Sequence, residues 1–106
     1  MPVPDLDREQ RRKALEKAAE VRRVRAELKQ MIKAGEVPLD EVLAKADANE
    51  ILAKTKVVDV LEAMPNYGKV KARKLMERLR ISPTRRLRGL GANQRQALLD
   101  EFGDAG

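Results

Sequence analysis

The chain has 106 residues, 38% of them charged, and a formal net charge of +6. The absence of cysteine excludes disulfides, thiolate zinc sites and cysteine nucleophiles, and the absence of histidine removes the usual general base and metal ligand. We therefore expect no enzymatic activity, no metal, no cofactor and no small-molecule substrate. No apolar run approaches the length of a membrane span and the N-terminus lacks the apolar core of a signal peptide, so a cytoplasmic location is expected.

The N-terminal third predicts a short arm followed by a long helix. Residues 1–5 contain two prolines, and Asp7 with Gln10 has the spacing of a capping box. No helix breaker occurs from Arg8 to Lys33, and Gly35 supplies the stop. A narrow apolar stripe can dock only the C-terminal half, so we expect the N-terminal half to project or fray. The stripe consists of Ala14, Val21, Val24, Leu28 and Met31, supported by Leu15 and Ala18.

The sign of the charge reverses from Glu36 to Pro65, where seven acids face three lysines. Short helices are predicted at Leu39–Ala46, at Asn49–Ala53 with its first residue as the N-cap, and at Lys56–Ala63. We expect this acidic middle to act as a scaffold that faces away from any ligand. Its predicted buried residues are Val42, Leu43, Ile51, Leu52, Val57, Val60, Leu61 and Met64.

A strongly basic stretch follows. From Asn66 to Arg95 there are ten Lys or Arg and one acid, Glu77, so the formal charge is +9. A focused cationic surface without an acidic counterweight suits a polyanion, because each neutralised phosphate releases counterions. The pattern predicts helices at Lys69–Leu79 and Ala92–Phe102 and no strand in the chain. Between them we expect a turn at 81–84 that starts one helical turn through Leu87, then a break at 89–91. The predicted buried residues here are Val70, Leu75, Met76, Leu79, Leu98, Leu99 and Phe102.

Two elements of this stretch have the chemistry of phosphate ligands. Gly68 precedes a lysine-rich helix, so the backbone can approach a phosphate closely and the free N–H groups of the helix start can bind it. In Ser82–Leu90, two hydroxyls stand beside three arginines, whose planar guanidinium groups suit phosphates or a narrow minor groove. A glycine before a helix also makes ordinary turns. Two such elements flanking one cationic helix, however, favour a nucleic-acid partner.

The segment PNYGKVKARKLMERLRISPTRRLRGLGANQRQALLDEF (65–102) resembles the helix-two-turns-helix module. Together with DREQRRKALEKAAEVRRVRAELK (7–29) and KTKVVDVLEAM (54–64), it makes the whole chain similar to the actinobacterial integration host factor family. The resemblance implies an all-α fold, with a long N-terminal helix followed by a compact bundle of short helices. It also implies a nucleoid-associated protein that binds and bends duplex DNA with little sequence preference. We expect an arm and long basic helix over 1–35, and a globular domain over 36–106 with the module at about 56–102.

The resemblance also implies which residues bind DNA. Its backbone clamp corresponds to Pro65, Asn66, Gly68, Lys69, Val70, Lys71 and Arg73, and its arginine turn to Arg85, Arg86 and Arg88. The chemistry of the residues adds Lys74, Ser82 and Thr84, and it suggests a second DNA face comprising Arg22, Arg25, Lys29, Lys54 and Lys56. The chain departs from the family pattern at Asn66 and Tyr67, since such hairpins usually have glycine and a small aliphatic residue there. Asparagine tolerates a left-handed backbone, and Tyr67 is expected to fill the core rather than to stack on a base.

Three alternatives remain open. A ribosomal protein family that binds structured RNA shares the module, although it usually ends in a basic tail, whereas this chain ends in DEFGDAG. DNA glycosylases with an N-terminal proline nucleophile also contain it, but Val3 replaces their acidic residue and their catalytic β-domain and zinc-finger cysteines are missing. A coiled coil through Arg8–Lys33 would span only about three heptads with alanine at key positions. We therefore expect a monomer.

Overall fold

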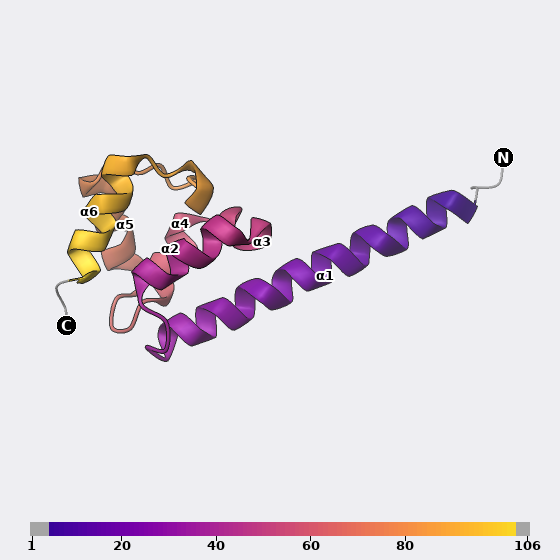
Figure 1. The fold of residues 1–106 in the computed structure, drawn as a ribbon, viewed down its shortest axis with the longest axis horizontal. Coiled ribbons are helices and arrows are strands. Elements are labelled where there is room, and N and C mark those ends of the chain that lie inside the picture. The colour runs from indigo at the N-terminus through magenta and orange to yellow at the C-terminus, as the bar shows by residue number, and fades with distance from the viewer. Residues whose placement is uncertain (1–4, 104–106) are drawn as a thin grey trace.

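The computed structural model describes residues 5–103, which form six α-helices and one 3-10 helix (Figure 1). Lys56 and Arg86 make an isolated antiparallel bridge, and no strand occurs within these residues, which confirms the expected all-α fold. No described helix combines the length and the apolar character that crossing a bilayer would need. The helices are α1 (Asp5–Lys33), α2 (Leu39–Ala48), α3 (Glu50–Ala53), α4 (Val57–Ala63), α5 (Gly68–Arg78), η1 (Leu87–Gly89) and α6 (Ala92–Gly103).

Helix α1 begins earlier than the sequence pattern predicts. The expected capping box at Asp7 is wrong, because Asp7 lies inside the helix. Asp7 lies in the first turn, where the helix dipole favours an acidic residue, so it is compatible with a helix that starts before it. The remaining residues of the predicted arm, 1–4, lie outside the described part of the chain. At the other end Gly35 has φ +73°, and the N–H of Glu36 donates to the carbonyl of Met31 at 3.0 Å, which closes the helix as expected.

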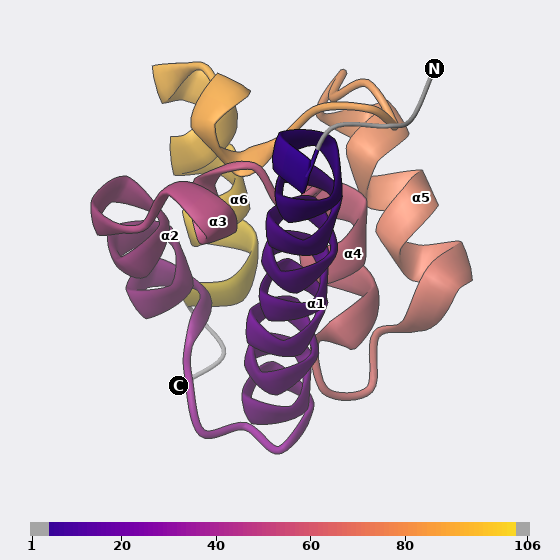
Figure 2. The ribbon, with the colours of Figure 1, turned by 90° about the vertical axis from the view of Figure 1, so that its right-hand side faces the viewer.

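Only the C-terminal half of α1 packs on the rest of the molecule. Leu28 and Ile32 are buried, and the helix contacts α3 and α4, whereas Leu15 is 71% exposed. The N-terminal half therefore projects, as expected, and it does so as a continuous helix (Figures 1 and 2). The predicted stripe missed Ile32, which is more deeply buried than Met31.

The acidic middle forms the scaffold beside α1. Asn49 caps α3, because its side-chain oxygen accepts from the N–H groups of Ile51 at 2.9 Å and Leu52 at 3.2 Å. The predicted interior is largely confirmed, although Ile51 and Met64 are only half-buried. Thr55 is also buried, with its hydroxyl donating to the Ile51 carbonyl at 3.2 Å. α2 contacts α6 and η1, so the last helix closes the bundle against the middle of the chain.

The basic stretch folds as the helices α5 and α6, joined by a connection that contains the 3-10 helix η1. The expected helical turn through Leu87 is wrong, since the 3-10 helix begins at that residue. Val70 was predicted to be buried but is 67% exposed, and Ala72 faces the core instead. Helix α5 ends at Arg78, with Leu79 as its C-cap. Arg80 follows with φ +59°, and the N–H of Ile81 donates to the Met76 carbonyl at 2.8 Å, which together form a helix-ending motif that usually uses glycine.

Candidate nucleic-acid interface

The first element of the candidate interface is the turn between α4 and α5, which we call the clamp turn (residues 65–68). Asn66 and Gly68 have φ of +63° and +81°, so the expected left-handed asparagine is confirmed. Tyr67 precedes α5 without a side-chain cap, and the first turn of the helix holds no acid. The free N–H groups at the start of this 11-residue helix and the positive end of its dipole therefore favour an anion.

The side chains around the clamp turn also favour the binding of an anion. The predicted residues are all solvent-exposed, namely Pro65, Asn66, Gly68, Lys69, Val70, Lys71, Arg73 and Lys74. Lys71 approaches the Asn66 carbonyl at 3.5 Å and lies 6.0 Å from the centre of the Tyr67 ring. Exposure of Val70 beside these cations leaves an apolar side chain free to contact a sugar. The clamp turn and the first turns of α5 thus present one continuous basic surface.

Tyr67 is a structural residue rather than a stacking platform. Its ring is half-buried and packs against Phe102, with 5.0 Å between ring centroids and 57° between planes. Burial raises the pKa of the Tyr67 hydroxyl above 10.0, with a further contribution from the negative charge of Glu101. The expectation that Tyr67 fills the core is confirmed, and the ring ties the clamp turn to the end of α6.

The second element is the arginine turn, residues 82–89, which is fastened to the α3–α4 connection. The N–H of Val57 donates to the Arg85 carbonyl, and the N–H of Leu87 donates to the Thr55 carbonyl, both at 2.9 Å. Because these bonds link two segments of backbone, the turn holds its position without any ligand. Leu87 is buried beneath it and anchors it to the core.

The side chains of the arginine turn differ in freedom. Arg85 is half-buried and donates to the Gly89 carbonyl at 2.9 Å, whereas Arg86 and Arg88 are exposed. Ser82 and Thr84 are exposed and lie 3.0 Å apart between hydroxyl oxygens. A depression of about 310 Å³ is lined by these five residues and Gly89. Its hydroxyl and guanidinium donors suit a phosphate group.

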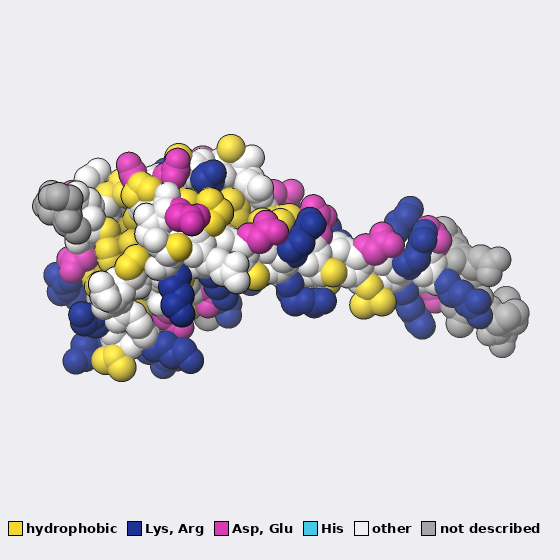
Figure 3. All heavy atoms as spheres, turned by 90° about the horizontal axis from the view of Figure 1, so that it is seen from below, with side chains coloured by type: hydrophobic (Ala, Val, Ile, Leu, Met, Phe, Trp, Pro, Cys, Tyr) yellow, Lys and Arg dark blue, Asp and Glu magenta, His cyan; other side chains and the backbone are white. Residues whose placement is uncertain are grey.

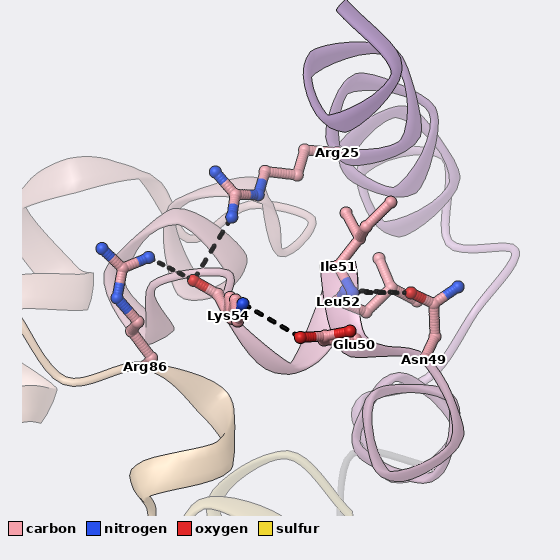
Figure 4. Close-up of polar contacts among 7 residues, drawn as sticks. All are labelled: Arg25, Asn49, Glu50, Ile51, Leu52, Lys54 and Arg86. Carbon is pink, nitrogen blue, oxygen red and sulfur yellow. Dashed lines mark hydrogen bonds and ion pairs between the residues drawn. The ribbon is translucent and has the colours of Figure 1, made fainter. Parts of the chain in front are cut away.

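Helix α1 connects the two elements. Arg25 from α1 and Arg86 from the arginine turn both donate to the carbonyl oxygen of Lys54, the former at 3.4 Å (Figure 4). One turn further along α1, Lys29 lines a groove of about 760 Å³ together with the clamp turn. The predicted second DNA face is therefore not a separate surface, because Arg25 and Lys54 adjoin the arginine turn and Lys29 adjoins the clamp turn. Lys56 is exposed and pairs with Arg86 in the backbone bridge. Arg22 is also exposed and lies three residues before Arg25 in α1.

Two basic residues of the 66–95 stretch do not belong to this surface. Arg95 forms a two-bond ion pair with Asp47 at 2.8 and 3.0 Å, and Arg78 pairs with Glu101 at 2.9 Å. The other eight Lys and Arg of the stretch make no ion pair within residues 5–103. The expected lack of acidic partners therefore holds for eight of the ten basic residues, because acidic residues from outside the stretch form ion pairs with the other two.

Acidic residues also enter the interface, contrary to the expectation that the middle of the chain faces away. Glu50 lies 3.0 Å from the Lys54 ammonium, and Asp59 and Glu62 line the groove beside the clamp turn. The pKa of Glu50 is lowered, first by its bond to Lys54 and then by the charges of Lys17 and Arg88. Sequence reasoning missed Lys33, which lines the groove four residues after Lys29; that spacing was the available signal.

Comparisons with known proteins agree with this geometry. Residues 32–102 match the family model described as S13-like H2TH domain. The chain is 56% identical over 105 residues to the integration host factor of Mycobacterium tuberculosis, covering 99% of this chain and all of the relative. It is 49% identical over 106 residues to that of Streptomyces coelicolor, covering 100% and 99%. A solved structure of "sIHF bound to an 8bp palindromic DNA" superposes with a TM-score of 0.81 at 49% identity, over 83% of this chain and 99% of the other.

Proposed function

Because the chain belongs to the integration host factor family, we propose that it is a nucleoid-associated protein that binds duplex DNA with little sequence preference. The observation that carries this proposal is the pairing of an uncapped, acid-free helix start at Gly68 with a backbone-fastened arginine turn, on one cationic surface. Figure 3 shows Lys and Arg side chains gathered along one edge of the globular part. The relative of known structure was solved on DNA, which favours a duplex over structured RNA as the partner.

The contacts would divide between the two strands. The clamp turn with Lys69, Lys71 and Arg73 holds one phosphate backbone through N–H groups and charge. The depression with Arg86 and Arg88 holds the other, and Ser82 and Thr84 add hydroxyl donors. Phosphate contacts fix position without reading bases, which accounts for weak sequence preference. An arginine in the minor groove would sense groove width rather than sequence.

Bending follows from the extent of the surface. Arg22, Arg25 and Lys29 continue the cationic surface from both elements along the docked half of α1. A duplex that curves toward this helix gains further phosphate contacts, and bending a short site costs roughly 1–6 kcal/mol. We propose that the protein is architectural rather than catalytic, that it acts in the nucleoid, and that bending affects transcription and recombination. The division into a basic helix over 1–35 and a domain over 36–106 stays a prediction.

Titration by fluorescence anisotropy tests the proposal. Two unrelated DNA duplexes and a matched RNA duplex are titrated at several salt concentrations with the unmodified protein and with Lys69→Glu/Arg73→Glu. Similar affinity for both DNAs, weaker RNA binding and a large loss in the variant are expected. The control Lys13→Glu/Lys45→Glu changes the net charge equally at exposed positions outside the predicted interface and should lose far less. Tighter RNA binding would refute duplex DNA as the preferred partner. Equal losses of affinity in the two variants would refute the proposed interface.

A further inference from the structure

The projecting half of α1 carries an apolar side chain that phosphate binding does not explain. Leu15 is 71% exposed. On the same helical face its neighbours three and four residues away are Arg11, Arg12, Ala18 and Ala19, without an acid. We call Arg11, Arg12 and Leu15 the tip patch. It combines one apolar side chain with two positive charges, of which Arg12 also pairs with Glu9 on the preceding turn.

The charge of the projecting half argues against DNA as the partner of the tip patch. Residues 5–20 contain five basic and five acidic residues and are therefore neutral overall. Residues 21–33 contain five basic residues and one acid, so the positive charge of α1 is concentrated in its docked half. Attraction for a polyanion is thus weakest where Leu15 is exposed.

A surface of complementary character lies on the globular part. A groove of about 560 Å³ separates the start of α2 from the end of α6. Its lining includes the apolar side chains of Leu39, Leu99 and Phe102, together with Asp40 and Asp100, the latter accepting a hydrogen bond from Gln96 at 2.9 Å. No Lys or Arg among the described residues lines it. We call it the end groove.

The tip patch and the end groove lie toward opposite ends of the molecule, whose longest dimension is 60 Å (Figure 1). From this arrangement we propose that the tip patch of one copy docks in the end groove of a second copy. Leu15 then contacts the Leu99 and Phe102 side chains, while Arg11 and Arg12 approach the carboxylates of Asp40 and Asp100. Each copy offers one tip patch and one end groove, so copies join head to tail and form a row wherever the successive contacts do not close into a ring.

The proposed contact between copies is small and forms only between copies that are bound to the same DNA. A single helix turn in a groove buries far less than the roughly 1,200 Å² of a stable interface, so the free protein stays monomeric. Copies bound to one duplex are held at a high effective concentration, which makes the same weak contact productive. Cooperative binding to long DNA is therefore the expected consequence, and in this respect the inference rests on the proposed function.

The first test compares binding to a short and a long duplex. A span of 60 Å corresponds to about 18 base pairs at 3.4 Å per pair, so a duplex of that length is too short for two copies joined end to end along it. Leu15→Gln should bind the short duplex like the unmodified protein. On a duplex about ten times longer it should lose cooperativity, with binding to neighbouring sites weakened roughly tenfold or more. Glu16→Gln, at the next position of the helix but on a different face, is the control and should remain cooperative.

A charge exchange identifies the partner surface. Arg11→Glu and Asp100→Lys should each reduce cooperativity, and the double variant should restore it, because the swapped charges again attract. If Leu15→Gln weakens binding to the short duplex and Asp100→Lys strengthens it, the tip patch contacts DNA and the head-to-tail contact is refuted. Unaltered cooperativity in Leu15→Gln refutes it as well. Failure of the unmodified protein to bind the short duplex would instead refute the proposed function.

Discussion

Glu50 offers the sharpest test of how the interface is charged. It lies 3.0 Å from Lys54, close enough to Lys17 and Arg88 for their charges to lower its pKa, and its side chain is 77% exposed. On the proposed interface, a carboxylate in this position would hold Lys54 away from a phosphate and repel the DNA backbone. We predict that Glu50→Gln increases DNA affinity, because the substitution removes the repulsion and frees the ammonium group.

The expected magnitude follows from counterion release. One additional lysine–phosphate contact makes the slope of log affinity against log salt concentration steeper by about 0.9. Between 50 and 200 mM salt, a fourfold change, affinity should then fall about 3.5-fold more in Glu50→Gln than in the unmodified protein. Fluorescence anisotropy on one duplex across that range measures the difference. Glu41→Gln, which removes an exposed carboxylate from the first turn of α2, is the matched control.

A second substitution, at Lys54, separates the release of its ammonium group from the loss of repulsion by Glu50. If the extra slope comes from Lys54, it should disappear when Glu50→Gln is combined with Lys54→Gln, leaving only the smaller gain from lost repulsion. An unchanged or weaker affinity in Glu50→Gln at every salt concentration would show that this carboxylate lies away from the DNA. An equal gain in Glu41→Gln would show that net charge, and not position, controls binding.

Three further outcomes are expected. Arg85→Ala with Arg86→Ala should weaken binding similarly on unrelated duplexes and make the salt slope shallower by about 1.8 if both contact phosphates; a loss confined to one sequence in the anisotropy titrations would instead indicate base readout. Asn49→Ala should lower the free energy of unfolding by about 1 kcal/mol and the melting temperature by roughly 4–8 °C in thermal unfolding, while Asn49→Asp should keep the cap; equal losses would contradict the capping role. The pKa of Asp47 is held below its ordinary 3.8 by its bond to Arg95, so its stabilising contribution exists above that value and is lost as pH falls through the lowered one. Asp47→Asn should therefore be less stable than the unmodified protein in urea at pH 7, and the difference should vanish in strong acid.

Features that depend on near neighbours along the chain could be predicted from the amino-acid sequence. Gly35 ends α1 and Asn49 begins α3 because capping joins groups only a few residues apart. Asn66 takes the left-handed conformation because its own side chain tolerates it. The helical class and the projecting half of α1 follow from the same local rules of periodicity, capping and composition, whereas the family was indicated by the resemblance of whole segments to known proteins.

The pairing of charges and the contacts between distant surfaces became visible in the folded structure alone. Arg95 is neutralised by Asp47, 48 residues away, and Lys54 receives Arg25 and Arg86 from two distant segments. Val70 and Ala72 are both compatible with an apolar helix face, and the packing of α5 chose the smaller one for the core. Such outcomes depend on distances across the fold. An ion pair or a buried contact forms only where packing brings its partners together. The residues next to each partner in the sequence do not indicate which distant residue that will be.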